Sequence, residues 1–318
     1  MKLNLIGAGN MAQAYARVLS AKAVNYNVIG RGEKSANTFS DAIGINPFIG
    51  GLKQFIKHHP DQLAASAIVA LPVADLAEAC SSLVKAGTKR VLVEKPGGLN
   101  LSEITQLADL TKKHGAKIFV ALNRRFFSSV IEAKKRIVDD GGATSFTFEF
   151  TEWARAIEKT EHPPIVKENW FLANSLHVVD LAFYLGGRPS SLYAESGGSL
   201  DWHSRASRFC GAGRSETGAT FSYHADWNAP GSWGLEILTH HHRYILRPLE
   251  KLQVQNLNSI DIKIQPINDQ LDTDFKPGLF QMVETFLSND KNQYLPSISR
   301  HQKNTKDILS AKEQEVYM

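Results

Sequence analysis

Cysteine is scarce in this sequence, which contains only Cys80 and Cys210 among its 318 residues. Disulfide-dependent domains use many more cysteines, so we expect no disulfide framework, which favours a reducing compartment. No apolar run approaches the roughly 18 residues of a transmembrane helix. A strand-like segment follows Met1 almost at once and leaves no room for a secretory signal. We therefore expect a cytoplasmic protein with no membrane partner.

Long runs of one charge are also missing. The 36 basic and 32 acidic residues give a formal net charge of only +4, and no basic tail occurs, so we expect no nucleic-acid partner. The sequence has no internal repeat and no low-complexity tract. With 43% hydrophobic residues, the chain can bury a sizeable core, and its length favours two domains.

The first informative motif opens the chain. The apolar run Leu3–Ile6 stops at Gly7, and a helix-compatible run begins by Met11, so the glycines lie between a strand and a helix. Such a turn binds a dinucleotide pyrophosphate: Gly7 permits the tight turn, Gly9 allows close approach, and Ala12 packs helix against strand. The expected contacts are Gly7, Gly9, Asn10, Met11 and Ala12.

Strand and helix patterns alternate through the first third of the chain, which predicts a doubly wound parallel sheet of the α/β class in residues 1–122. Residues 43–61 are less regular and have room for at most one short strand and one short helix. The expected strands are Leu3–Ile6, Tyr26–Ile29, Ala67–Ala70, Val91–Glu94 and Ile118–Leu122, and the expected helices are Met11–Ser20, Ser35–Ala42, Ala74–Ala86 and Ser102–His114.

After Leu122 the pattern changes to that of an α+β domain spanning residues 123–318, with an open, mostly antiparallel sheet. Beyond a loop marked by Pro163 and Pro164, one helix pattern runs to Tyr184 and stops at Gly186 and Gly187. Two late helices either pack on this sheet or return to the first domain. The other expected elements are helices Ser128–Val138, Pro277–Leu287 and Arg300–Lys312, and strands at Ser145–Thr151, near Leu192, and at Thr217–Tyr223, Leu235–Thr239, Tyr244–Leu246, Leu252–Gln255 and Ile260–Ile264.

The end of the second strand bears on the cofactor. An acidic residue there would bind the adenosine ribose of NAD, but this strand is followed by Gly30 and Arg31, with no acid at its tip. Arg31 can pair with a 2′-phosphate and Ser35 can donate to it, which favours NADP. In the alternative, Arg31 is a solvated loop residue and Glu33 turns inward to the ribose, which would make NAD the cofactor.

Two further segments should reach the same sheet edge, beside the nicotinamide. Leu71 and Pro72 follow the Ala67–Ala70 strand; Pro72 either rigidifies a cofactor turn or simply starts a helix. The sequence Glu94-Lys95-Pro96 follows a buried parallel strand. A residue before proline is biased toward extended geometry and its bond can be cis, which would aim Lys95 at a substrate oxygen.

Four groups of residues together form a recognisable pattern: Gly7, Gly9 and Ala12; Glu94, Lys95 and Pro96; Asn123, Arg124, Arg125 and Phe126; and His177 with Asp180. Through them the chain resembles the Gfo/Idh/MocA oxidoreductase family. The resemblance implies an N-terminal Rossmann domain, a C-terminal α/β domain whose open sheet mediates homo-oligomers, and a small-molecule substrate.

The same resemblance implies catalytic roles for two residues. Lys95 would orient the reacting hydroxyl or carbonyl, and His177, a residue type with an ordinary pKa near 6.5, would carry the proton. Asn174, His177 and Asp180 are spaced by three and would share one helix face, so Asn174 and Asp180 are expected at the substrate. The resemblance adds Arg124 to the expected substrate contacts. The family's aspartate four residues before the histidine is Ala173 here. In the alternative, His177 is a core residue paired with Asp180.

The predicted function is an NAD(P)-dependent oxidoreductase acting on a sugar, polyol or nucleotide-sugar. The segment Lys167–Gly187 is similar to family members of bacterial surface-polysaccharide synthesis, which favours an activated sugar. The alternatives are a non-catalytic NAD(P)-sensing regulator and a reductase of a non-sugar carbonyl or imine. Consecutive histidines at 240–242 alternate faces along a strand, so we predict no metal site.

Overall fold

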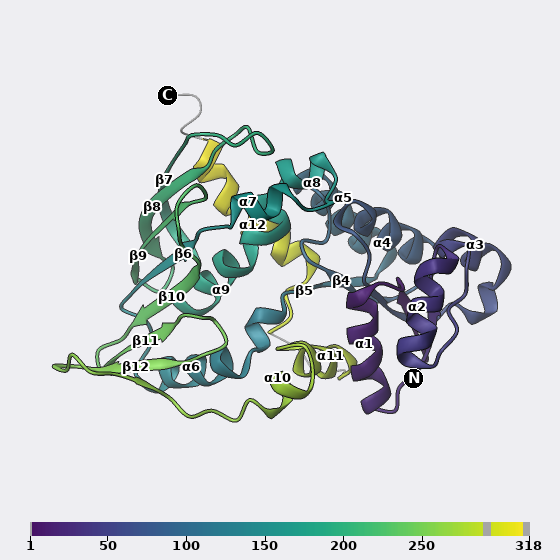
Figure 1. Cartoon of the computed structure of the whole chain (residues 1–318), viewed down its shortest axis with the longest axis horizontal. Helices are drawn as coiled ribbons and strands as arrows, with labels where there is room; N and C mark the ends of the chain where they lie inside the picture. Colours follow the sequence, from purple (N-terminus) through teal and green to yellow (C-terminus); the bar gives the residue numbers. More distant parts are fainter. Residues whose placement is uncertain (1, 289–293, 314–318) are drawn as a thin grey trace. The chain divides into compact units, whose positions relative to one another are not determined.

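The computed structural model describes residues 2–288 and 294–313, and Figure 1 follows the chain by colour. The chain divides into two compact units. The first contains Met1–Leu122 and Thr273–Lys303, and the second contains Asn123–Asp272 and Asn304–Met318. The last change of unit falls inside the helix α12 (Ile298–Glu313).

The first unit is built on a parallel sheet. Among the described residues its strand order is β2-β1-β3-β4-β5, and every pairing is parallel. The strands are β1 (Lys2–Ile6), β2 (Asn25–Ile29), β3 (Ser66–Val69), β4 (Arg90–Glu94) and β5 (Lys117–Ala121). Because the chain turns to opposite sides after β1 and β3, the crevice between their carboxyl ends is where such sheets bind ligands.

Helices cover both faces of this sheet. One group packs α3, α4 and α5 against the buried residues of β3 and β4, while α1 contacts α2 and α11 on the other face. The helices are α1 (Asn10–Ala21), α2 (Glu33–Ile43), α3 (Gly51–His58), α4 (Leu76–Lys85), α5 (Leu101–His114) and α11 (Leu279–Leu287), with short turns η1 (Pro60–Gln62) and η2 (Val73–Asp75).

The late segment explains why residues 273–303 belong to the first unit. Arg90, at the start of β4, donates to the carbonyl of Phe286 and lies over the rings of Phe119 and Phe286, each 5.4 Å from the guanidinium carbon. Lys22 pairs with Glu284 at 2.7 Å. Of the two placements left open by the sequence, α11 therefore takes the return to the first unit.

The second unit contains a larger sheet. Within the described part of the chain its order is β13-β12-β11-β10-β6-β9-β8-β7, and only the β6–β9 pairing is parallel. This confirms the predicted fold class. The strands are β6 (Ser145–Phe150), β7 (Pro189–Gly197), β8 (Arg208–Ser215), β9 (Thr220–Asp226), β10 (Trp233–Leu238), β11 (His242–Leu246), β12 (Gln253–Asn256) and β13 (Ile262–Ile264).

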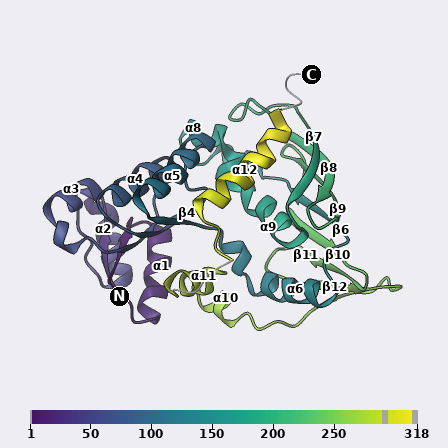
Figure 2. The ribbon, with the colours of Figure 1, turned by 180° about the vertical axis from the view of Figure 1, so that it is seen from behind.

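One face of this second sheet is covered and the other is open. Figure 2 shows α6 and α9 on the same side of the sheet, where Phe146, Phe148 and Phe150 of β6 join the hydrophobic core. The alternate residues, such as Thr147 and Glu149, face the open side, as period-two patterning requires. The helices are α6 (Ser128–Asp139), α7 (Ala154–Glu158), α8 (Pro164–Glu168), α9 (Leu176–Gly186) and α10 (Gln270–Asp274), with a 3-10 turn η3 (Asn123–Phe126) and a π-helical turn η4 (Phe171–Ser175).

Several predicted elements differ from the structure. The single helix expected to end at Tyr184 is broken into α8, η4 and α9. The strand β8 and the short helices α7 and α10 were not predicted. Residues 43–61 contain the helix α3 and an isolated parallel bridge between Ile29 and Phe48, in agreement with the one short strand and one short helix allowed there.

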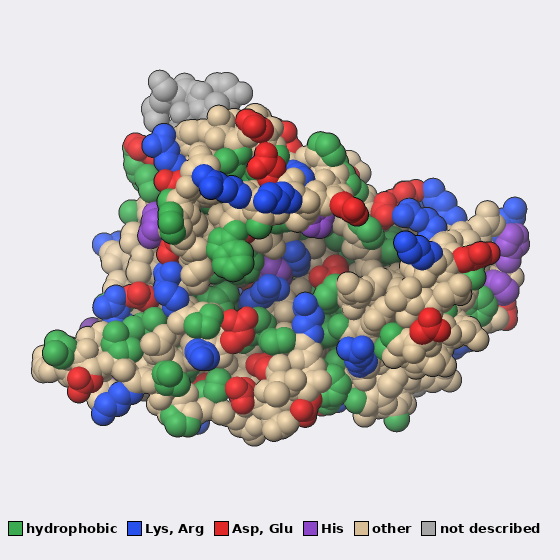
Figure 3. All heavy atoms as spheres, in the orientation of Figure 1, with side chains coloured by type: hydrophobic (Ala, Val, Ile, Leu, Met, Phe, Trp, Pro, Cys, Tyr) green, Lys and Arg blue, Asp and Glu red, His purple; other side chains and the backbone are tan. Residues whose placement is uncertain are grey.

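Basic and acidic side chains are interspersed over the face seen in Figure 3. Across residues 2–288 and 294–313, no helix has both the length and the apolar character needed to cross a bilayer.

Candidate functional site

The glycine turn after β1 has the geometry that a pyrophosphate seat requires. Gly7 has φ +119°, a left-handed conformation, and a Cβ there would overlap the carbonyl oxygen of Ala70. Gly9 has φ −85°, and nothing lies within 4 Å of the position its Cβ would occupy. Gly7 is therefore needed by the fold, whereas Gly9 leaves open space above the backbone.

The helix that follows the turn completes this seat. The helix α1 begins at Asn10 with no side-chain cap and no acidic residue in its first turn. The first-turn N–H groups, those of Asn10, Met11 and Ala12, have no intrahelical acceptor, and the helix dipole favours an anion beside them. Together with the open space at Gly9, this donor set fits a dinucleotide pyrophosphate.

Two more segments reach the same edge of the sheet, because all five strands are parallel. Leu71 and Pro72 follow β3, and Leu71 lies beside Gly7, with its Cδ2 atom 3.5 Å from the position of a Cβ there. Pro72 precedes the turn η2 with φ −54°. It can therefore both start this helical turn and rigidify a turn beside the cofactor. Lys95 follows β4, is half-buried, and its peptide bond to Pro96 is cis.

Glu94 anchors the end of β4 to α1. The Tyr15 hydroxyl donates to Glu94 Oε1 over 2.7 Å. Burial, and secondly the Glu94 carboxylate, raise the pKa of Tyr15 well above its ordinary value, so this hydroxyl stays protonated and keeps donating. The sequence prediction placed Glu94 at the cofactor. The structure gives it this structural partner as well.

The residues predicted to contact the adenosine ribose lie after β2. Arg31 is 84% exposed, and its Nη1 lies 3.7 Å from Asp75 Oδ2. The Ser35 hydroxyl donates to the carbonyl of Gly32 over 3.1 Å. Ser35 would have to turn away from that carbonyl to donate to a phosphate, so Arg31 is the principal group available for a 2′-phosphate.

In the second unit, His177 is held by an arginine. Its Nε2 lies 2.8 Å from Nη1 of Arg124, and the histidine is only 3% exposed. A guanidinium only donates, so Nε2 must accept and the proton of the neutral ring belongs on Nδ1. Arg124 also lies over the ring of Trp233, 5.6 Å from its centre. Nε2 is therefore the basic atom of this histidine.

Asp180 is occupied by the neighbouring arginine. Arg125 Nε and Nη2 donate to the two carboxylate oxygens over 2.7 and 2.5 Å, and both side chains are about nine-tenths buried or more. Both oxygens of Asp180 are thus engaged inside the fold. The alternative in which Asp180 pairs with His177 does not hold, because each residue contacts a different arginine.

Asn174 is held by a residue that the sequence did not single out. Glu152, which follows β6 and is 6% exposed, accepts hydrogen bonds from Asn174 Nδ2 at 3.0 Å and from Ser175 Oγ at 2.7 Å. Both donors are in the π-helical turn η4, immediately before the helix that carries His177. π-helical turns are frequent at functional sites. Glu152 therefore fixes the entry to α9.

The comparison with family models agrees with a nucleotide site at the glycine turn of the first unit. Residues 1–122 match the model described as the oxidoreductase family with an NAD-binding Rossmann fold, Gfo/Idh/MocA. The N-terminal domain belongs to the Gfo/Idh/MocA oxidoreductase family. This confirms the resemblance and the prediction of an NAD(P)-dependent oxidoreductase at the level of the family. No curated protein matches the sequence.

Solved structures resemble this chain over both units, which establishes its fold. The three named here are at most 18% identical to it. An oxidoreductase from Agrobacterium radiobacter, in complex with NAD+, L-tartaric acid and magnesium, has a TM-score of 0.78 at 16% identity and covers 98% of this chain and 95% of its own. Levoglucosan dehydrogenase in complex with NADH has 0.75 at 18%, covering 98% and 97%. UDP-N-acetylglucosamine 3-dehydrogenase from Acidithiobacillus ferrooxidans has 0.73 at 13%, covering 98% and 96%.

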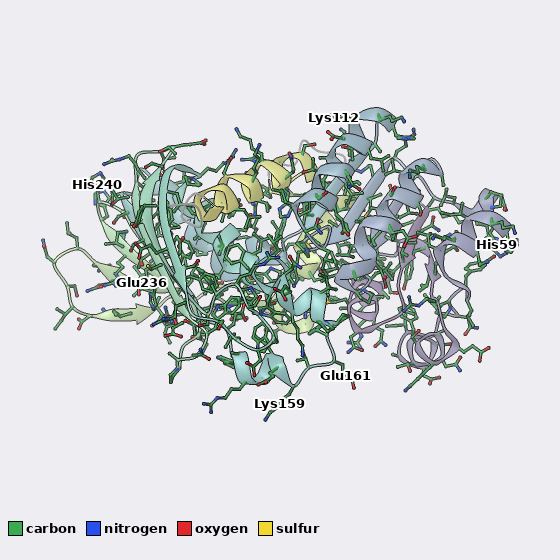
Figure 4. The ribbon with its side chains drawn as sticks, turned by 90° about the horizontal axis from the view of Figure 1, so that it is seen from above. His59, Lys112, Lys159, Glu161, Glu236 and His240 are labelled. Carbon is green, nitrogen blue, oxygen red and sulfur yellow. The ribbon has the colours of Figure 1, made fainter. Side chains whose placement is uncertain are left out.

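The histidines at 240–242 contribute to a structural contact. His240 is exposed at the end of the β10–β11 hairpin (Figure 4), while His242 Nδ1 lies 2.8 Å from Asp140 Oδ2. Burial opposes the charge of Asp140, but hydrogen bonds from His242, Thr239 and Tyr244 hold its pKa below the ordinary value. In the described part of the chain, no three His, Cys, Asp or Glu side chains converge so as to hold a metal ion.

Replacing Glu152 with glutamine is expected to destabilise the second unit by about 1–3 kcal/mol, because one buried donor loses its acceptor. Urea denaturation would measure the change in the free energy of unfolding. The exposed Glu161 (Figure 4) provides the matched control, since Glu161→Gln removes the same charge from the surface. Equal stability of the two variants would contradict the assignment of Glu152.

Proposed function

We propose that the protein is an NAD(P)-dependent dehydrogenase or reductase that acts on a hydroxyl or carbonyl of a sugar, polyol or nucleotide-sugar. One observation carries the proposal: Lys95 follows β4 at the sheet edge that holds the glycine turn, in a domain of an NAD-binding oxidoreductase family. The substrates named for two structural relatives, levoglucosan and UDP-N-acetylglucosamine, support the sugar class. An activated sugar, as used in bacterial surface-polysaccharide synthesis, is the narrower form of this proposal.

The chemistry follows from the properties of two side chains. A nicotinamide, when bound, supplies the acceptor or donor of the hydride. In the oxidative direction the Lys95 ammonium donates to the reacting hydroxyl oxygen and stabilises the negative charge that develops on it. His177 takes the hydroxyl proton at Nε2, where the substrate replaces Arg124 as hydrogen-bond donor. In the reductive direction the same atoms return the proton to the carbonyl oxygen.

We assign NADP as the preferred cofactor, with NAD also accepted. The support is the cation at the end of β2, since a guanidinium matches the geometry of a phosphate better than that of a ribose hydroxyl. Leu71 and Pro72 would flank the nicotinamide portion, and Arg124 and Asn174 would contact the substrate. Asp180, with both oxygens bound by Arg125, takes a supporting role instead of substrate binding.

A homo-oligomer through the second sheet is the proposed assembly. Its open face exposes Tyr193 near one edge and Ile262 and Ile264 at the other, at 64%, 51% and 67% respectively. Edge strands with exposed apolar residues are normally covered, and a second copy of the same sheet would cover this face. Light scattering coupled to gel filtration would measure the assembled mass.

The activity is tested by incubating the purified protein with NADP+ or NAD+ and a panel of sugars, polyols and nucleotide-sugars. Growth of the reduced-nicotinamide absorbance with one member of the panel is the expected result. Tight binding of the nucleotide without turnover of any substrate, including non-sugar carbonyls and imines in the reductive direction, would favour the sensing regulator and overturn the enzyme.

The pyrophosphate seat gives a matched pair of substitutions at the two glycines. Gly9→Ala is expected to leave the free energy of unfolding within about 0.5 kcal/mol and to weaken NADPH binding at least about tenfold, because the new methyl occupies the space next to the phosphates. Gly7→Ala is expected to destabilise the fold by about 2 kcal/mol or more, because φ +119° strains any L side chain.

Calorimetric titration with NADPH and urea denaturation of both variants would separate the two effects. If Gly9→Ala binds NADPH with unchanged affinity, the pyrophosphate does not bind at this turn. A stable Gly7→Ala protein would show that the loop can relax, against the overlap with Ala70.

A further inference from the structure

An ion pair spans the cofactor edge of the first unit. Arg31 Nη1 and Asp75 Oδ2 are 3.7 Å apart, with the side chains 84% and 41% exposed. Arg31 follows β2, and Asp75 ends the turn η2 after β3, whereas β1, which leads into the glycine turn, lies between those two strands. The pair therefore joins the loops on either side of the strand whose end forms the pyrophosphate seat.

The main chain of Arg31 is fixed by a hydrogen bond, but its guanidinium can change partner. Its main-chain carbonyl accepts from the N–H of Gly50 over 3.2 Å. Its stem passes over Gly51, where a Cβ would lie 3.9 Å from Arg31 Cγ. With its main chain held and its side chain 84% exposed, Arg31 can turn its guanidinium from one nearby acceptor to another.

A second ion pair lies close by and does not involve Arg31. Lys53 of α3 binds Glu78 of α4 at 2.5 Å, with exposures of 76% and 66%. Glu78 is three residues after Asp75, so the two acids belong to the same local segment but bind different cations. This neighbouring pair provides a control of equal charge.

We propose that Asp75 is a specificity-determining residue that competes with the 2′-phosphate of NADP for the guanidinium of Arg31. The inference rests on the proposed function in one respect, that Arg31 is the phosphate contact. A phosphate that binds Arg31 must displace the Asp75 carboxylate and then remain near a like charge. NADH carries no 2′-phosphate, so its binding neither displaces the Asp75 carboxylate nor suffers repulsion from it. Asp75 therefore weakens NADPH binding more than NADH binding and reduces the difference in affinity between the two nucleotides.

The effect of Asp75 on the Kd for NADPH can be estimated from the interaction of two exposed charges in water. Two unit charges about 4 Å apart in water interact by an energy equivalent to about a fivefold change in a binding constant. Because both side chains are exposed, the effect should shrink at high ionic strength, where the Debye length falls to a few ångströms.

Calorimetric titration of the full chain with NADPH and with NADH tests the proposal, using Asp75→Asn, Glu78→Gln, Arg31→Gln and the double variant Asp75→Asn with Arg31→Gln. In Asp75→Asn the Kd for NADPH is expected to fall about fivefold at low salt and by less at about 1 M salt, with the Kd for NADH changed by less than about twofold. Glu78→Gln is expected to leave both constants within about twofold. In the Arg31→Gln background most of the gain from Asp75→Asn should be lost, because only the repulsion between Asp75 and the phosphate remains.

The outcomes separate this inference from the proposed function. If Arg31→Gln weakens NADPH but Asp75→Asn changes nothing, or changes both nucleotides equally, the competition is overturned while Arg31 keeps its role. A full gain that persists without Arg31 also overturns the competition. If Arg31→Gln leaves the NADPH constant unchanged, the phosphate assignment fails and the inference fails with it. Wild-type protein that binds neither nucleotide would overturn both.

Discussion

Replacement of Lys95 by alanine is expected to lower turnover by about a thousandfold or more and to change the Kd for NADPH by less than about threefold. The reason is that the ammonium acts on the reacting oxygen, where charge develops, and removal of one such preorganised donor typically costs a factor of about 100–1,000 in kcat, with a lost orienting role added. Steady-state kinetics on the substrate found by the panel, with calorimetry for the nucleotide, would measure both quantities.

The control for this substitution is Lys85→Ala, which removes an exposed lysine at the end of α4. It is expected to retain wild-type turnover. Lys95→Arg keeps the charge but not the compact ammonium, so we expect partial activity at most. Lys95→Ala protein with more than about a tenth of wild-type turnover would exclude the proposed chemistry, because no general catalytic role for this group would survive.

The first unit could be predicted largely from local sequence because each of its signals is local. A continuous apolar run such as Val91–Val93 marks a parallel strand buried on both faces. The turn at Gly7 needs a conformation that glycine alone adopts easily, and glycine stands there. In this unit local propensity and tertiary packing point to the same structure, so strands and helices were found close to their true bounds.

The strand β8 shows where local signals fail. Its residues Gly211 and Gly213 lower strand propensity, and the sequence pattern gave no strand there. In the structure, a Cβ at Gly213 would overlap the carbonyl of Ser191 in β7, and one at Gly211 would overlap the ring of Tyr223 in β9. The glycines are needed for close approach of the neighbouring strands, so the feature that hides the strand is the one that allows it to pack.

The structure separates the residues of the predicted cluster around His177 by giving each a different partner. Spacing by three suggested that Asn174, His177 and Asp180 share one face and one task. The structure instead gives them three partners, Glu152, Arg124 and Arg125, which come from 22, 53 and 55 residues away. Helical periodicity describes which side chains share a face, but pairing across such separations is set by the tertiary fold.

The pairing of Asp180 with Arg125 predicts a large effect of mutation on the free energy of unfolding. Asp180→Asn is expected to lower the free energy of unfolding by about 3–5 kcal/mol, because it leaves a buried guanidinium without its carboxylate. Urea denaturation followed by circular dichroism would measure this loss as a lower midpoint at an unchanged slope. Arg125 also lies 4.6 Å from the ring centre of Tyr184, so its position is fixed by packing and it cannot easily turn to water.

A double replacement decides whether this loss comes from the unpaired charge. Arg125→Met with Asp180→Leu removes both charges and keeps apolar volume, so it is expected to recover most of the stability lost in Asp180→Asn, as for other buried pairs exchanged for hydrophobic residues. If Asp180 contacted substrate instead, Asp180→Asn would keep its stability within about 0.5 kcal/mol and lose activity. That result would support a contact between Asp180 and the substrate. A loss of stability that the double replacement reverses would instead show that Asp180 holds α9, and with it His177, in place.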